Sequence, residues 1–84
     1  MKARVFVKLK KSVLDPQGKT IQHSLSNLGY HDVQGVRQGK FFEIVLNADL
    51  SQDEARQQVE SIAKKVLTNP VIEDFRYELD SSHD

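Results

Sequence analysis

The sequence predicts an α+β fold in which strands and helices follow one another in the order β-α-β-β-α-β. Three observations predict it. Several short segments alternate between apolar and polar residues, two longer stretches carry apolar residues at helical spacing, and glycine or proline separates these segments. Right-handed crossovers in both halves allow one four-stranded antiparallel sheet with both helices on one face. This arrangement is ferredoxin-like or closely related to it.

The first strand and the first helix are predicted by local chemistry. Apolar residues recur at every second position of the strand, at Val5, Val7 and Leu9. Asp15 then supplies a carboxylate for a helix N-cap, and Pro16 takes the first helical position, where its missing amide hydrogen costs nothing. We expect the helix to span residues 16–28 and to end at Gly29, which adopts the left-handed conformation easily.

Two strands are predicted in the middle of the chain, at residues 33–38 and 41–47. The second is richer in aromatic and β-branched residues, which strands favour. Gly35 suggests a bulge or a close approach in the first. Gly39 and Lys40 fit a tight turn between the two strands, as in a hairpin.

The second helix begins with a capping box, because Ser51 and Glu54 have the spacing at which each side chain bonds the other residue's amide. Apolar residues then recur at helical spacing, at Ala55, Val59, Ile62, Ala63, Val66 and Leu67. Pro70 cannot donate an amide hydrogen and moves Asn69 out of the helical region. The helix is therefore expected to end near Thr68.

The last strand is expected to begin at Val71, directly after that proline, and its core face carries Val71, Phe75, Tyr77 and Leu79. Glu73 interrupts this face. Asp74 points to the other face, so the two adjacent carboxylates cannot act as a catalytic pair. Residues 79–84 are expected to form a short polar tail.

Length and composition limit the classes of function. The 84 residues make one domain, residues 1–84. Twelve basic and 12 acidic residues give a formal net charge of zero, which argues against nucleic-acid binding. The chain has no cysteine and no apolar run long enough for a signal peptide or a membrane span. We therefore expect a cytoplasmic protein that has no disulfide and does not bind a membrane.

No group of residues predicts a catalytic, cofactor or metal site in this chain. The three histidines, at 23, 31 and 83, lie on a polar helix side, in a loop and in the tail, without the spacing of a metal motif. The segment from Asp15 to Gly18 lacks the repeated glycines of a phosphate-binding loop, so helix capping is its better interpretation.

The sheet face away from the helices is predicted to carry apolar side chains, at Phe6, Phe41, Val45 and Ile72. A soluble monomer rarely leaves such a patch exposed, so we expect a homodimer or a higher homo-oligomer, formed through this face or by sharing strands. The alternative is that these side chains lie singly among charged neighbours and have no partner.

Four blocks of sequence, in the same order and over nearly the whole chain, resemble the PurS family, the small subunit of phosphoribosylformylglycinamidine synthase. The blocks are Lys8-Leu9-Lys10 leading to Val13-Leu14-Asp15-Pro16-Gln17-Gly18, Leu28-Gly29, Val36-Arg37-Gln38-Gly39-Lys40, and Leu67-Thr68-Asn69-Pro70-Val71-Ile72-Glu73-Asp74-Phe75.

The resemblance implies a non-catalytic subunit of an ATP- and glutamine-dependent C–N ligase complex of de novo purine synthesis. In that family a glutaminase subunit releases ammonia, a synthetase subunit uses ATP and magnesium, and the small subunit is required for their association and aids ammonia transfer. No cofactor is expected on this chain itself. Exposed residues of the matching blocks are the expected contacts with the two partner subunits: Lys10, Asp15, Gln17, Arg37, Lys40, Glu73 and Asp74.

Two other classes of function fit the predicted fold. The first is a ligand-sensing module that binds amino acids at a dimer interface through residues 29–33, in which case the ligand would raise thermal stability. The second is an RNA-binding sheet on which Phe6 and Phe41 stack bases. Zero net charge and the acidic residues of the last strand weaken the second.

Overall fold

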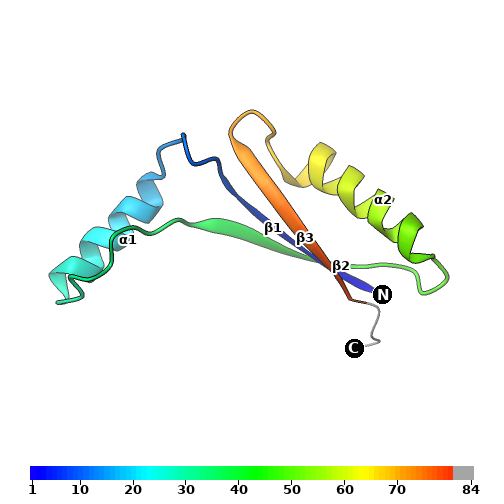
Figure 1. The fold of residues 1–84 in the computed structure, drawn as a ribbon, viewed down its shortest axis with the longest axis horizontal. Helices are drawn as coiled ribbons and strands as arrows, with labels where there is room; N and C mark the ends of the chain where they lie inside the picture. The colour runs from blue at the N-terminus through cyan, green and yellow to red at the C-terminus, as the bar shows by residue number, and fades with distance from the viewer. Residues whose placement is uncertain (81–84) are drawn as a thin grey trace.

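The computed structural model describes residues 1–80, in which three strands form one antiparallel sheet (Figure 1). Strand β1 (Lys2–Leu9) lies in the middle and pairs with β2 (Gly39–Val45) on one side and β3 (Glu73–Asp80) on the other. The predicted first strand is thus confirmed, and it becomes the centre of the sheet.

The buried core is small and lies on one face of this sheet. Its fully buried side chains all belong to valine or alanine, at Ala3, Val5, Val7, Ala55, Val59 and Ala63. Larger half-buried side chains pack around them, at Phe42, Ile44, Leu46, Leu67, Phe75, Tyr77 and Leu79. Alternation along β1 produces this face, because every second side chain of a strand points the same way.

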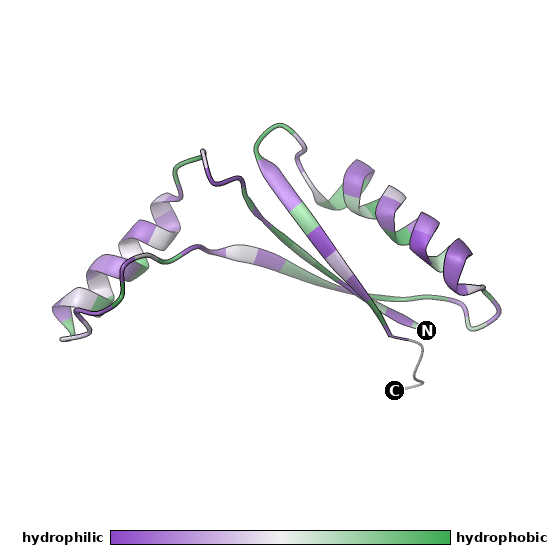
Figure 2. Cartoon of the chain, viewed as in Figure 1, coloured by the Kyte–Doolittle hydropathy of each residue, from purple (hydrophilic) through white to green (hydrophobic). Residues whose placement is uncertain are grey.

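Helix α2 (Gln52–Ile62) covers that face and continues into one π-helical turn, η1 (Ala63–Leu67). The predicted capping box is confirmed, since the Ser51 and Glu54 side chains each accept the other residue's backbone N–H. Figure 2 shows hydrophobic colour on the side of α2 that faces the sheet. The Tyr77 hydroxyl donates to Glu60 Oε1 at 3.0 Å and ties β3 to the helix.

The predicted apolar stripe of this helix is wrong at its last turn. Val66 leaves 74% of its surface exposed, although a regular α-helix would turn it toward the core. The cause is the π-helical turn, whose wider hydrogen-bond spacing changes the direction in which the residues within it point. Ala63, at the start of that turn, stays buried.

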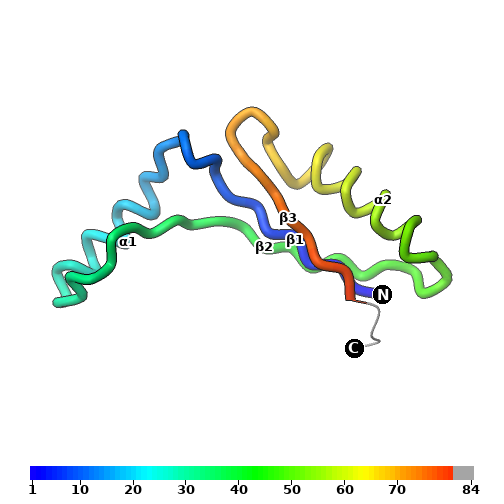
Figure 3. Tube along the Cα trace, in the orientation of Figure 1, coloured from blue at the N-terminus to red at the C-terminus, as the bar shows by residue number. Residues whose placement is uncertain are grey.

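Helix α1 (Pro16–Asn27) has nearly the predicted bounds, and its predicted N-cap is confirmed because Asp15 accepts the backbone N–H of Gly18. Gly29 has a φ of 101°, the left-handed conformation expected after a helix end. The helix does not cover the sheet, however. It lies beyond the end of the sheet and on the other side from α2 (Figures 1 and 3).

Two predicted features of the fold therefore differ from the structure: among residues 1–80 the sheet has three strands rather than four, and one helix rather than two packs on it. Residues 33–38 have no regular structure, because they return along α1, where there is no strand edge for their amides to join. The interior of α1 carries only Ile21 and Leu25 as large apolar residues, too few for a broad core-facing stripe.

The predicted turn at Gly39 and Lys40 and the predicted start of the last strand also differ from the structure. Gly39 and Lys40 are the first two residues of β2 and are extended. Residues 70–72 form a turn, because the Asn69 carbonyl accepts the N–H groups of Ile72 and Glu73 at 3.2 and 2.7 Å. The last strand begins at Glu73, two residues later than expected, so the predicted place of Val71 on the core face is wrong: it lies in the turn and is 78% exposed.

The described chain is long and flat, with extents of 51 × 30 × 14 Å. Its radius of gyration is 16.4 Å, whereas a compact domain of this length has about 12 Å. The difference comes from α1 and the two segments that connect it to the sheet, which together form a projecting arm, residues 10–38 (Figure 3).

Candidate functional site

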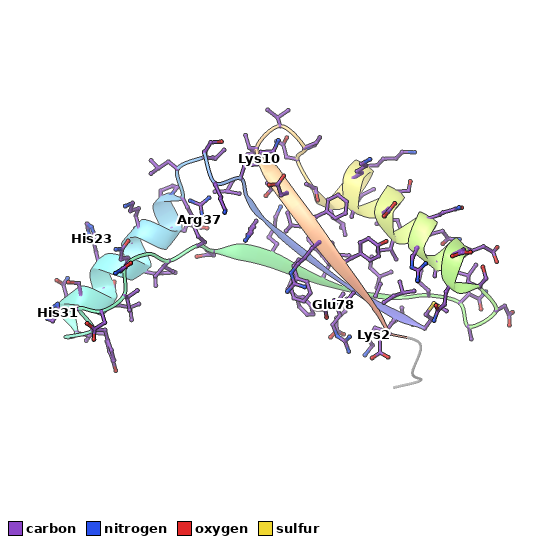
Figure 4. All side chains as sticks on the ribbon, viewed as in Figure 1. Lys2, Lys10, His23, His31, Arg37 and Glu78 are labelled. Carbon is purple, nitrogen blue, oxygen red and sulfur yellow. The ribbon has the colours of Figure 1, made fainter. Side chains whose placement is uncertain are left out.

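The residues predicted to contact partner subunits gather at the end of the sheet from which the arm departs. We call this region the junction and define it as residues 9–18, 36–40 and 69–74. Figure 4 shows Lys10 and Arg37 there, between α1 and the strands. A hollow of about 220 Å³ at the junction is lined by Asp15, Gln17, Lys40 and Glu73, among others.

Asp15 is buried at the junction, with only 4% of its surface exposed. Its Oδ1 accepts the Gly18 N–H at 2.9 Å, and its Oδ2 accepts the Gln38 N–H at 2.8 Å. These two bonds hold the pKa of the carboxyl below its ordinary value of 3.8, and the bond from Gly18 has the larger effect. The carboxylate therefore links the start of α1 to the start of β2, and its contact with a partner subunit stays a prediction.

Arg37 also forms hydrogen bonds within the chain. One guanidinium nitrogen, Nη2, donates to the carbonyls of Lys10 at 2.7 Å and Leu9 at 3.2 Å, and Nη1 donates to the carbonyl of Val13 at 3.2 Å. The side chain closes over the segment that leads from β1 into α1. Its residue surface is nonetheless exposed, so a partner can still reach it.

Lys40 and Glu73 form an ion pair across the junction, with Nζ 3.3 Å from Oε2. The Glu73 side chain is only 12% exposed, and its Oε1 accepts the Asn69 N–H at 2.8 Å. This hydrogen bond, followed by the contact with Lys40, lowers the pKa of Glu73. The predicted hairpin-tip position of Lys40 is wrong, but its side chain is exposed, as a binding residue requires.

Gln17 and Asp74 are exposed at the junction, and Lys10 is half-buried. Asp74 lies on the open face, which is the sheet face turned away from α2. There it helps to line a second hollow, of about 430 Å³, with Lys8, Arg37 and Phe41. Among the seven predicted contacts, Gln17, Lys40 and Asp74 are thus the ones with the most freedom to meet another protein.

The open face carries one aromatic row between charged rows. Phe6 and Phe41 lie opposite each other, with ring centroids 5.1 Å apart, and the Arg76 guanidinium lies 4.1 Å above the Phe6 ring. Val45 is 78% exposed on the same strand as Phe41. Ile72 lies in the turn before β3 and not in the strand, and its place on this face stays a prediction.

Within residues 1–80 no three His, Asp or Glu side chains come together in a way that could hold a metal ion. His23 lies on α1 and His31 in the loop after it, both exposed (Figure 4). His83 falls outside the described residues. In the same part of the chain no helix is long and apolar enough to cross a membrane.

Sequence reasoning found the Asp15 cap but missed the bonds from Asp15 to Gln38 and from Arg37 to the carbonyls. A cap follows from local spacing, whereas those bonds join residues more than 20 positions apart. The only available signal was that both residues lie in blocks that resemble the same family.

Comparison with known proteins decides which family this is. The family model described as PurS, phosphoribosylformylglycinamidine (FGAM) synthase, matches residues 2–81. The chain belongs to the PurS family. It is therefore a subunit of that synthase, which acts in purine biosynthesis.

Relatives of known role support this membership. The PurS subunit of FGAM synthase from Bacillus subtilis is 44% identical over 79 residues, which cover 94% of this chain and 92% of the relative. The crystal structure of PurS from Methanocaldococcus jannaschii, one of the subunits of formylglycinamide ribonucleotide amidotransferase, matches with a TM-score of 0.87 at 38% identity and covers 98% of each chain.

A chain in the PurLQS structure from Thermotoga maritima also shares the fold. Its TM-score is 0.74 at 24% identity, and the match covers 92% of this chain and 93% of that one. At that identity the likeness concerns the fold alone.

Proposed function

We propose that this chain is the non-catalytic subunit that joins a glutaminase subunit to a synthetase subunit and aids the passage of ammonia between them. The observation that carries the proposal is the match to the PurS family over residues 2–81 of 84. The fold is compatible with this role, because residues 1–80 offer exposed surfaces for contact with partner subunits.

The protonation of ammonia in water explains why a joining subunit is needed. Ammonia released into bulk water is protonated and loses the lone pair with which it attacks, so glutaminase and synthetase must be held together. In this proposal ATP and magnesium bind the synthetase subunit, and glutamine binds the glutaminase. The small subunit seals or aligns the junction between them by protein contacts alone.

The junction is the proposed contact surface for the partner subunits. Lys40 presents an ammonium and Asp74 a carboxylate on neighbouring parts of the chain, while Gln17 offers both donors and acceptors. Charges of both signs at an exposed surface favour a partner with a complementary charge pattern, which sets orientation and specificity.

Homo-oligomerisation is the second part of the proposal, with another copy of this chain as the occupant of the open face. Phe41 is 52% exposed on that face, and Leu28 and Tyr30 near the tip of the arm are 74% and 61% exposed. Because α1 projects from the same side of the sheet as the open face, one second copy placed there meets both apolar surfaces (Figure 1).

The junction is tested by co-elution with purified glutaminase and synthetase subunits. We expect Lys40→Glu together with Asp74→Lys to abolish the complex, because both charges are reversed where a complementary surface must approach. The matched control is Lys64→Glu with Asp53→Lys, two exposed sites on the helical side. Unchanged co-elution of the junction variant would show that the partners bind elsewhere.

A further inference from the structure

At the base of the arm, the segment that enters α1 and the segment that returns to the sheet are held together by two crossing sets of hydrogen bonds that involve Asp15 and Arg37. Asp15 stands on the segment that enters α1, and it accepts the N–H of Gln38, on the segment that leaves the arm, at 2.8 Å. Arg37 stands on the leaving segment and donates to the carbonyls of Lys10 and Val13, on the entering segment, at 2.7 and 3.2 Å. Each segment thus holds the other.

Gly18 brings the same two segments into direct contact. A Cβ atom at this position would lie 2.1 Å from the carbonyl oxygen of Val36, a separation that no side chain tolerates. The glycine is buried, and its N–H donates to Asp15 Oδ1. The first turn of α1 is therefore packed against the returning backbone, and the Asp15 carboxylate lies beside that contact.

The rest of the arm has little that could hold it in place. No element of the described sheet or of α2 packs extensively on α1, and along the arm itself Gln22 Nε2 donates to the Gln34 carbonyl at 3.2 Å. A helix without a packing partner keeps its direction only through the joint at its base. That joint consists of Asp15, Gly18 and Arg37.

We propose that Asp15 and Arg37 form a clasp that fixes the direction of the arm and so positions α1 for contact with a second copy of the chain. The last clause rests on the proposed homo-oligomer. Both are positioning residues: their polar atoms are engaged within the chain, and they act through the placement of α1. A preset arm lowers the ordering cost of association, because its direction need not be fixed on binding.

The test measures the direction of the arm and the strength of association separately. The chain has no cysteine, so nitroxide labels on Ser26→Cys in α1 and Lys64→Cys in η1 report one distance, with unlabelled chain in excess to exclude pairs between copies. We expect a single narrow distance distribution for the parent. In Asp15→Asn, Arg37→Gln and Gly18→Ala it should broaden into several maxima.

Sedimentation of the unlabelled variants gives the second reading. We expect the clasp variants to associate with a dissociation constant raised about tenfold, while amide exchange at Val5 and Val7 stays as slow as in the parent. The matched controls, Asp53→Asn and Arg56→Gln, remove an exposed pair of the same chemistry on α2 and should change neither reading.

The outcomes are distinct. Unchanged distance distributions in all three clasp variants would overturn the clasp. Broader distributions with unchanged association would overturn its positioning role. A parent chain that stays monomeric at every concentration would overturn both the proposed homo-oligomer and the positioning role. In that case the distance distributions alone would still decide whether the clasp exists.

Discussion

Asp15 has one role that the sequence predicts and a second role that only the structure shows. Its role as an N-cap was predictable, because a carboxylate before Pro16 matches a local pattern. Its second bond, to Gln38, was not, because it depends on the returning path of the arm. For such a residue, the hydrogen bonds to near neighbours in the chain can be predicted from the sequence. The hydrogen bonds to distant residues require the structure.

The lowered pKa of Asp15 predicts a specific acid sensitivity. Because the folded chain binds this proton less tightly than the unfolded chain, the stabilisation is complete above the ordinary pKa of 3.8 and is lost as the pH falls through the lower folded value. The pKa of Glu73 is lowered too and acts in the same direction.

Urea unfolding of the parent and of Asp15→Asn at a series of pH values checks this. We expect the parent to be the more stable at neutral pH, because an amide offers only one acceptor oxygen to two N–H groups. The difference should shrink below about pH 4. Asp53→Asn, at an exposed site, should have nearly the stability of the parent at neutral pH. If the free energy of unfolding differed by the same amount between the parent and Asp15→Asn at every pH, the lowered pKa of Asp15 would be contradicted.

Thr68 places an unpaired polar group in the interior of the part of the chain that the structure describes. Its hydroxyl is buried and has no hydrogen-bond partner within residues 1–80. Thr68→Val keeps the shape and removes the unpaired group, so we expect the free energy of unfolding to rise by about 1 kcal/mol. Thr68→Ser retains the hydroxyl and loses a methyl group, so it should not stabilise. A less stable Thr68→Val would mean that the hydroxyl has found a partner.

At the scale of elements, the second helix shows what periodicity can predict and where it fails. The capping box follows from the spacing of Ser51 and Glu54. The burial of Ala55 and Val59 follows from a regular 3.6-residue repeat. Val66 does not, because the turn from Ala63 to Leu67 is π-helical. Nothing in the spacing of the apolar residues indicates that wider turn.

Two valines of this helical segment provide a matched test. Val59 is fully buried and Val66 is 74% exposed. We expect Val59→Ala to lower the free energy of unfolding by about 2 kcal/mol, and Val66→Ala to change it by less than about 0.5 kcal/mol. Chemical denaturation of the two variants checks this. Equal losses would mean that the helix continues regularly and buries both side chains.

The strand predictions divide in the same way. The alternation of apolar and polar residues predicted β1 and the strand at residues 75–79, and the structure confirms both. Residues 33–38 were expected to pair and do not, and Gly39 and Lys40 were expected to turn and instead begin β2. Pairing depends on which edge the chain reaches, and here the arm carries these residues away from the sheet.

At the scale of the whole molecule, the shape is the property that the sequence did not predict. A compact two-layer domain was expected, but the chain extends over 51 Å with one helix detached from the sheet. The family, by contrast, was recognisable from the sequence, because its blocks run in order along the chain and the family model matches residues 2–81.

The open face predicts how association responds to substitution. Phe41→Asp places a carboxylate in the aromatic row of that face, so we expect it to shift the chain toward the monomer in sedimentation experiments. The control is Val71→Asp, at another exposed apolar residue in the turn before β3. Loss of association in the control but not in Phe41→Asp would place the contact elsewhere.

The central claim is that this chain couples the release of ammonia to its use. The most direct measurement compares FGAM synthesis by the glutaminase and synthetase subunits, with and without this chain, using either glutamine or ammonium salt as the nitrogen source. We expect the glutamine-dependent rate to require the chain and the ammonia-dependent rate not to require it. Equal glutamine-dependent rates in its absence would contradict the account.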